Sequence, residues 1–330
     1  MKKISIILVF GLLLSCSQEG VYNDIPFDEM LVSVNTSLSK GAIIELPEDM
    51  QSVGVYAAHT VDMDWSNSTM FNKMNNQKFI YFSSSWKAEP TCVQWGNFSE
   101  NDKYTFYAYC PFAEKNSEII NHKIKNGSLQ INYDTPNNCQ EQMDLMLATP
   151  RKDMIKPKSR TVVLVFNHVL SVISFSATGK NKTIISAQLT NIKSNGIVGF
   201  SDSDAIVWRK RSMPKNFNFA LINNGFEDLL LIPQELSENT RLVVNYNDSI
   251  IHKDIVMEFD LATLTEFEIN NRYSLIVTLS SEPTLKVINS IWSNCEVEDI
   301  VIDGLPPTKI YINTGMWGEG NNDNNQDIII

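Results

Sequence analysis

The stretch Tyr104-Thr-Phe-Tyr-Ala-Tyr-Cys110-Pro111 decides the fold of this chain. Side chains in a strand point alternately to its two faces. One predicted face carries Tyr104, Phe106, Ala108 and Cys110, and the other carries Thr105, Tyr107 and Tyr109. Pro111 cannot donate a ladder hydrogen bond and is expected to end the strand. The run is the clearest strand in the first half of the sequence.

Similar short apolar runs lie on both sides of this strand, separated by turn residues. They cover residues 30–38, 41–46, 52–57, 161–175, 241–246, 255–259, 273–279 and 309–313. Three Asn-Gly pairs, at Asn126-Gly127, Asn195-Gly196 and Asn224-Gly225, predict hairpin turns. Helical periodicity over twelve or more residues is not found. The pattern predicts an all-β protein built from two β-sandwiches with Greek-key loops.

The first sixteen residues have a different character. Lys2 and Lys3 precede an apolar core at residues 4–14, and Leu13-Leu14-Ser15-Cys16 follows. This segment resembles a bacterial lipoprotein signal, which implies that residues 1–15 are removed and that Cys16 is acylated. The alternative is an ordinary secretory signal with a chance cysteine. Both alternatives predict a body outside the cytoplasm, and Ser17 in place of an aspartate after Cys16 favours the outer membrane.

The rest of the chain is long enough for two domains, each with its own core. We expect a lipidated tether at residues 16–29, an N-terminal sandwich at 30–155 and a C-terminal sandwich at 156–330. The boundary is set by a basic, proline-containing connector at residues 151–160.

Composition and motifs exclude several functions. The formal net charge is −11, and removal of Lys2 and Lys3 takes it to −13, so nucleic acid is not an expected partner. No motif for catalysis, a cofactor or a metal is found, and the four histidines have no partner at ligand spacing. We therefore predict a protein that is not an enzyme. Four cysteines remain after Cys16, either free or with Cys92 and Cys110 paired; they are Cys92, Cys110, Cys139 and Cys295.

Three tryptophans, Trp65, Trp86 and Trp95, lie among Asn and Ser residues in the first half. Their rings would suit stacking on a sugar. The alternative is that they fill the core beneath long loops. The sequence leaves both roles open.

Six segments together resemble the fimbrillin-like family of Bacteroidales, whose members are outer-membrane lipoproteins that build or accessorise surface fimbriae. The segments are Val53-Gly-Val-Tyr-Ala57, Thr105-Phe-Tyr-Ala-Tyr-Cys-Pro-Phe112, Asp144-Leu-Met-Leu-Ala148, Val163-Leu-Val-Phe-Asn-His-Val-Leu-Ser171, Leu230-Leu-Ile-Pro-Gln234 and Asn271-Arg-Tyr-Ser-Leu-Ile-Val277. The resemblance implies two tandem transthyretin-like sandwiches. It also implies assembly with other fimbrial subunits through β-strand addition.

In shaft subunits of that family a protease removes an N-terminal strand, and a segment of the next subunit fills the groove. The strand at residues 30–38 corresponds to the removable one, but the expected processing site holds Lys40, and the first arginine is Arg151. Either a lysine-specific protease acts, or the strand is kept and the protein is an anchor or accessory subunit. The apolar end Ile328-Ile329-Ile330 is a candidate donor strand. The alternative function is a surface lipoprotein that binds a glycan or host ligand through the Trp-bearing loops.

Overall fold

A computed structural model describes residues 30–36, 52–82, 85–96, 101–222, 225–292, 300–305 and 307–312 of the 330-residue chain. Across these residues the regular helical structure consists of two short 3-10 turns, η2 (Cys139–Glu141) and η3 (Ala262–Leu264). The remaining regular structure is strand, so the predicted all-β fold is confirmed. None of the described helical turns is long and apolar enough to cross a membrane.

An eight-stranded sheet in the N-terminal half closes on itself. Its strand order is β2-β3-β4-β1-β10-β8-β5-β9, and β2 also pairs with β5, so seven strands form a ring. Strand β9 pairs with the first part of β5, and β8 pairs with its last two residues. The strands are β1 (Leu31–Thr36), β2 (Ser52–Val61), β3 (Met74–Phe82), β4 (Ser85–Glu89), β5 (Asp102–Cys110), β8 (Met146–Ala148), β9 (Arg151–Met154) and β10 (Thr161–His168). We call this ring the N-terminal barrel.

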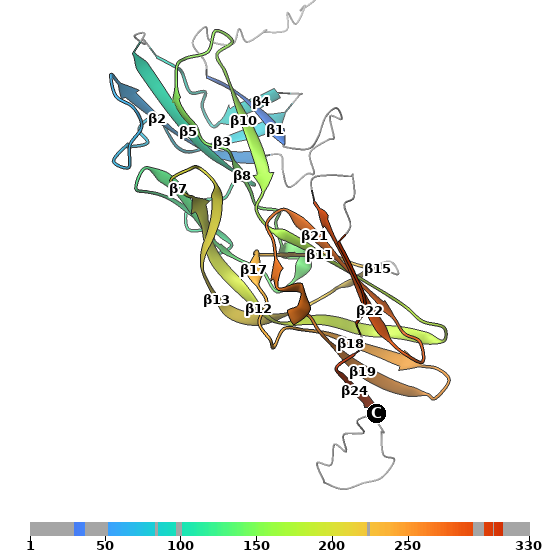
Figure 1. The fold of residues 1–330 in the computed structure, drawn as a ribbon. Coiled ribbons are helices and arrows are strands. Elements are labelled where there is room, and N and C mark those ends of the chain that lie inside the picture. The colour runs from blue at the N-terminus through green and yellow to red at the C-terminus, as the bar shows by residue number, and fades with distance from the viewer. Residues whose placement is uncertain are drawn as a thin grey trace, which may run out of the picture.

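A second sheet runs along most of the molecule. Its path is β24-β19-β18-β12-β7-β6, with β13 paired to the other edge of β12. The strands are β6 (Ile120–Lys125), β7 (Ser128–Asp134), β12 (Lys182–Phe200), β13 (Ile206–Asn218), β18 (Arg241–Asp248), β19 (Lys253–Asp260) and β24 (Lys309–Ile312). Strand β12 pairs with β18 over its first residues and with β7 near its end. Figure 1 shows β12 and β13 as long ribbons that join the two halves.

A five-stranded sheet completes the C-terminal half, in the order β16-β11-β21-β22-β23. Its strands are β11 (Ser171–Thr178), β16 (Leu229–Leu231), β21 (Asn271–Thr278), β22 (Thr284–Ile291) and β23 (Ile300–Leu305). Two small ribbons are formed by β14 (Leu221–Ile222) with β15 (Gly225–Phe226), and by β17 (Gln234–Glu235) with β20 (Glu266–Phe267). Apolar residues of β11, β21 and β22 pack against those of β12, β18 and β19 in one core, as in a sandwich.

Strand β5 shows how one sequence serves two cores. Its residues Tyr104, Phe106, Ala108 and Cys110 belong to the core inside the N-terminal barrel. Tyr107 and Tyr109 point the other way, into a core formed with β6, β7, β12 and β13. The predicted alternation is therefore confirmed. The outer core attaches the barrel wall to the long sheet.

The sheets do not follow the expected division between residues 155 and 156. Strand β10 lies after that point in the sequence but pairs with β1 and β8 in the barrel. Strands β6 and β7 lie before it but belong to the long sheet through β12. Part of the expected connector is itself strand, because Arg151–Met154 forms β9. The two-domain division remains a prediction about independent folding.

The Asn-Gly pairs behave differently from one another. Asn126 and Gly127 have φ values of 51° and 65° between β6 and β7, which confirms that hairpin turn. The turn expected at Asn195-Gly196 is wrong, because both residues lie within β12 and Asn195 pairs with Ser212. A Cβ atom at position 196 would lie 3.1 Å from the ring of Trp208, so the glycine permits close packing instead. At the third site Gly225 begins strand β15.

Candidate assembly strand and surface pocket

Strand β1 is a short strand of the N-terminal barrel that is paired very differently on its two edges. It pairs in parallel with β10 over six residue pairs, from Leu31 with Thr161 to Thr36 with Phe166. Its other edge pairs with β4 at a single position, Val32 with Trp86. Strand β1 is therefore paired along its whole length with β10 but at one position only with β4.

Side chains of β1 and of Met30, the residue before it, pack inside the barrel. Met30 and Val32 are 1% and 5% exposed, and both belong to the barrel core. The Met30 N–H donates to the Val93 carbonyl at 2.7 Å, and the Leu31 N–H donates to the Arg160 carbonyl at 3.1 Å. An apolar strand thus occupies a slot that offers both backbone partners and pockets for alternate side chains.

Three of the sequence-predicted elements of assembly lie outside the described residues. These are Cys16, Lys40 and the segment Ile328-Ile329-Ile330. The described strand nearest the C-terminus is β24, which pairs with β19 at the end of the long sheet's path.

The three tryptophans predicted as candidate ligand contacts have different surroundings. Trp95 is 1% exposed, its Nε1 donates to the Arg160 carbonyl at 3.1 Å, and its ring meets that of Tyr104 edge-on at 4.8 Å. Trp86 is 8% exposed and packs beside Tyr81. Both rings fill the barrel core. Trp65, by contrast, is half-buried and lines a surface pocket.

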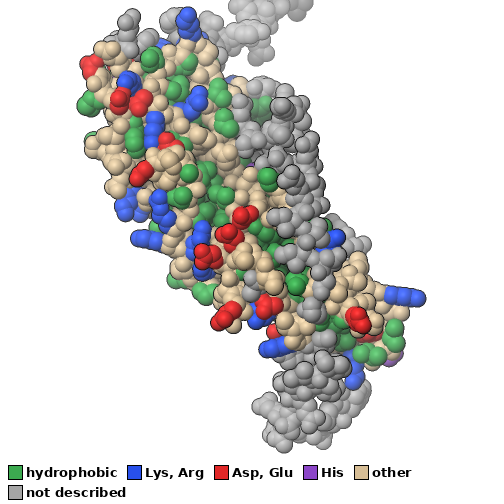
Figure 2. Space-filling model, in the orientation of Figure 1, with side chains coloured by type: hydrophobic (Ala, Val, Ile, Leu, Met, Phe, Trp, Pro, Cys, Tyr) green, Lys and Arg blue, Asp and Glu red, His purple; other side chains and the backbone are tan. Residues whose placement is uncertain are grey.

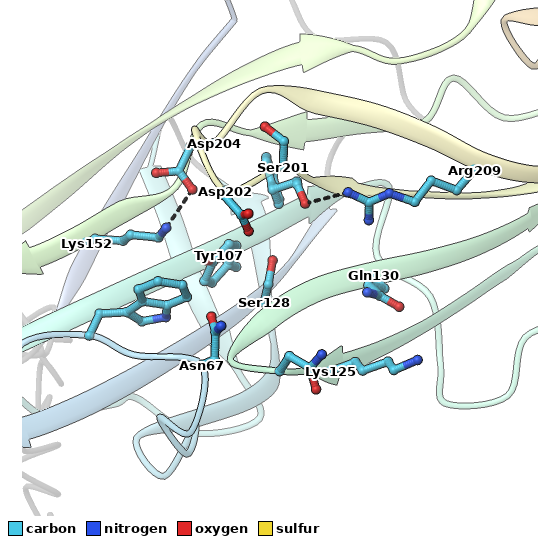
Figure 3. A pocket seen from close by; sticks show the side chains of 13 residues that line it. Asn67, Tyr107, Lys125, Ser128, Gln130, Lys152, Ser201, Asp202, Asp204 and Arg209 are labelled. Carbon is cyan, nitrogen blue, oxygen red and sulfur yellow. Dashed lines mark hydrogen bonds and ion pairs between the residues drawn. The ribbon is translucent and has the colours of Figure 1, made fainter.

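The pocket beside Trp65 has a volume of about 150 Å³ and is formed where five segments meet. They are the loop after β2, strand β5, the β6–β7 hairpin, strand β9, and the β12–β13 turn with its adjoining strand ends. Figure 3 shows Lys152 and Arg209 on opposite sides of it, with Tyr107 and Ser128 between them. Burial raises the pKa of Tyr107 to about 12, so its hydroxyl is neutral at physiological pH.

Trp65 is held in place by both backbone and side chains. Its N–H donates to Asp153 Oδ1 at 2.6 Å, and its Nε1 donates to the Gly127 carbonyl at 2.9 Å. The Lys152 ammonium lies 3.6 Å from the centre of the indole and 2.6 Å from Asp204 Oδ1. Several Lys and Arg side chains gather over the region of β7 and β13 on the face drawn in Figure 2. The pocket is therefore prearranged and lined by charge.

A polar network buried beneath the barrel wall contains His122, on β6. The Tyr56 hydroxyl lies 2.5 Å from its Nδ1, and its Nε2 lies 3.0 Å from the Ala113 carbonyl. Because a carbonyl can only accept, Nε2 carries the proton and Nδ1 accepts from Tyr56 in the neutral ring. Burial lowers the pKa of His122. This histidine stabilises the fold in its neutral form.

We expect His122 to make the protein less stable in mild acid. Its ordinary pKa is 6.5, so below that pH the unfolded chain takes up a proton that the folded chain resists. Stability should fall as the pH drops from about 6.5 toward the lowered folded pKa, and should not change further from this group below it. Urea unfolding at pH 7.5 and 5.5 tests this with wild type and His122→Gln. Equal losses of stability in the two proteins would rule it out.

Two other described histidines, His168 and His59, each lie beside a carboxylate. His168 Nδ1 lies 2.7 Å from Asp144 Oδ2, and the His168 ring stacks on the ring of Trp292. His59 Nε2 lies 3.1 Å from Asp102 Oδ2. Among the described residues no three His, Cys, Asp or Glu side chains are grouped to hold a metal. Cys92 is an exposed thiol and Cys110 and Cys139 are buried thiols, and none of the three is in a disulfide. Cys295 lies outside the described residues.

Comparison with known proteins gives one sequence match and several structural ones. Residues 47–299 match the sequence model of the fimbrillin-like family. A fimbrial protein from Bacteroides vulgatus superposes with a TM-score of 0.57 at 16% identity, covering 80% of this chain and 99% of its own. A candidate cell adhesion protein from Bacteroides uniformis gives 0.56 at 14% identity, covering 80% and 98%. Among proteins with curated functions, none matches the sequence.

Proposed function

Because the chain belongs to the fimbrillin-like family, we propose that it is a structural or accessory subunit of cell-surface fimbriae, joined to its neighbours by β-strand addition. Members of this family are fimbrial and cell adhesion proteins, and a structural role requires no catalytic centre. The observation that carries the proposal is the setting of β1. This one strand closes the barrel, with six residue pairs on one side and one on the other.

The same strand suggests which kind of subunit this is. No arginine precedes Arg151, so a protease that needs arginine has no site directly after β1. A subunit that keeps β1 and a lipid on Cys16 would have no open slot and would serve as an anchor or accessory subunit at the outer membrane. A subunit cut at Lys40 would have an open slot for a donor strand such as Ile328-Ile329-Ile330 of a neighbour.

The mass of the protein recovered from its own cells tests these alternatives. A first residue at Cys16 with the added mass of acyl chains would support an anchored subunit that keeps β1. A first residue at Gly41 would support a polymerising subunit. An unacylated chain that begins elsewhere before Met30 would contradict both the lipid anchor and the processing site.

A second proposed function is binding of a glycan or host ligand, and the pocket beside Trp65 favours it. Three aromatic side chains, three amide side chains and several charged groups converge there on a concave surface, and such groups can stack on a sugar ring and bond its hydroxyls. Adhesion would then use the side of the subunit, while assembly uses the β1 slot. The two proposed functions therefore do not compete for the same residues.

A further inference from the structure

Taking the second proposed function as its basis, we propose that the pocket beside Trp65 binds an acidic sugar, meaning a sugar ring that carries a carboxylate or sulfate group. The pocket is lined by three cationic side chains, Lys125, Lys152 and Arg209, and by two carboxylates, Asp202 and Asp204. The local sum is therefore +1, within a chain whose net charge is −11. A positive site on so acidic a protein favours an anionic ligand locally.

The pairing of these charges shows which of them faces the ligand. Lys152 and Asp204 neutralise each other at 2.6 Å, with exposed side-chain fractions of 19% and 34%. Arg209 is more exposed, and its Nη2 donates to the Phe200 carbonyl at 3.2 Å. That bond holds the guanidinium at the pocket while its other N–H groups stay available for a planar anion. A two-pronged contact of Arg with a carboxylate or sulfate is among the stronger polar interactions in proteins.

The remaining lining residues suit a sugar ring better than a bare anion. Asn67, Asn126 and Gln130 supply amide groups, and Ser128 and Ser201 supply hydroxyl groups, all of which can bond ring hydroxyls. The Trp65 indole has one face covered by the Lys152 ammonium, so a sugar would meet its edge or its other face; the residue is fixed by two hydrogen bonds, so little freedom is lost on binding. A volume of about 150 Å³ is small beside the roughly 300–1,000 Å³ of drug-sized sites. It therefore fits one ring, such as the end of a glycan, rather than a long chain.

Three sugars that differ only at carbon 6 provide a direct test with the full chain in detergent. They are the methyl glycosides of glucuronic acid, glucose 6-sulfate and glucose, and binding is followed by saturation-transfer NMR and titration. We expect the carboxylate and sulfate forms to bind at least fivefold more tightly than glucose. We also expect that preference to shrink at high salt.

Two single substitutions separate charge recognition from general adhesion. Arg209→Gln should weaken binding of both acidic sugars at least tenfold and leave glucose almost unchanged. Asp202→Asn should strengthen binding of the acidic sugars severalfold, because it removes a like charge from the pocket. Lys180→Gln, an exposed lysine of the C-terminal half, is the matched control and should change nothing. Thermal midpoints within a few degrees of wild type would show that the variants fold.

The outcomes distinguish this inference from the function on which it rests. Equal binding of all three sugars would overturn the acidic preference and leave glycan binding standing. Binding of none of them, nor of any member of a glycan array, would overturn both. An Arg209→Gln variant that folds normally and binds glucuronic acid as wild type does would overturn the inference even if the sugar binds.

Discussion

A chain that lacks residues 1–40 is expected to lose the closure of its N-terminal barrel and to associate into oligomers. The missing segment includes Met30, just before β1, and Val32 within it, and both side chains are almost fully buried. Burial of two such side chains contributes about 3–6 kcal/mol, a large part of the roughly 5–15 kcal/mol by which a typical domain is stable. The open slot would also leave the edge of β10 unpaired, and such an edge recruits strands from other chains. Size-exclusion chromatography and thermal unfolding measure both effects.

A synthetic peptide of residues 30–36 is the control for this experiment. Added in excess, it should refill the slot, raise the melting temperature and reduce the oligomers, since a ligand that binds only the folded state stabilises it. A peptide with Val32→Asp should fail, because the charge would enter the apolar core, whereas Ser33→Asp, on the neighbouring position of the strand, should work. A shortened chain that stays monomeric with unchanged stability would contradict strand addition through β1.

Strands were predicted well from the sequence where apolar and aromatic residues alternate clearly between the two faces. In β5 the alternation of side chains along 104–110 assigns residues to an inner and an outer core, and the structure confirms it. The Asn126-Gly127 turn was equally predictable, because both residues adopt the positive φ that a two-residue hairpin requires. At these positions the residue types themselves determine the local backbone structure.

The predictions from sequence failed where pairing between strands that are distant in the sequence determines the structure. Asn195-Gly196 is a dipeptide typical of hairpin turns. Strand β12 nevertheless continues through it, because β12 pairs there with β7 on one edge and with β13 on the other. Strand β10 likewise joins the barrel through β1, which lies far from it in the sequence. No local pattern records which distant strand will supply the hydrogen bonds, so the crossing of the expected domain boundary could not be predicted.

The pocket was only partly predictable for the same reason. Trp65 was a candidate from its residue type, together with Trp86 and Trp95, but the sequence could not separate the three. The signal that could have done so is weak: Trp65 lies in the polar run Asp62-Met-Asp-Trp-Ser-Asn-Ser-Thr69, which does not alternate as a strand does. Its charged neighbours Lys152, Asp204 and Arg209 come from other parts of the chain, so only the fold brings them together.

The second large effect is expected from substitution of the buried Trp95, and the half-buried Trp65 serves for comparison. Trp95→Ala should lower the free energy of unfolding by about 3–5 kcal/mol, the usual cost of removing a buried aromatic ring. The side chain is 1% exposed and its Nε1 bonds the Arg160 carbonyl, at the residue before β10. Loss of the ring should therefore weaken the region where β10 begins and pairs with β1. The urea concentration at the unfolding midpoint should be lower than in wild type.

Trp65→Ala is the matched control, and it links stability to the proposed binding function. This half-buried ring makes one hydrogen bond, worth roughly 0.5–1.5 kcal/mol, and one contact with the Lys152 ammonium, worth about 0.5–1 kcal/mol. Its loss should therefore cost about 1–2.5 kcal/mol, less than the loss of Trp95. If Trp65→Ala destabilised the protein as strongly as Trp95→Ala, the ring would be a core residue and the pocket would lose its main support. A small cost in stability together with a lost ligand would mean that this tryptophan serves a surface function.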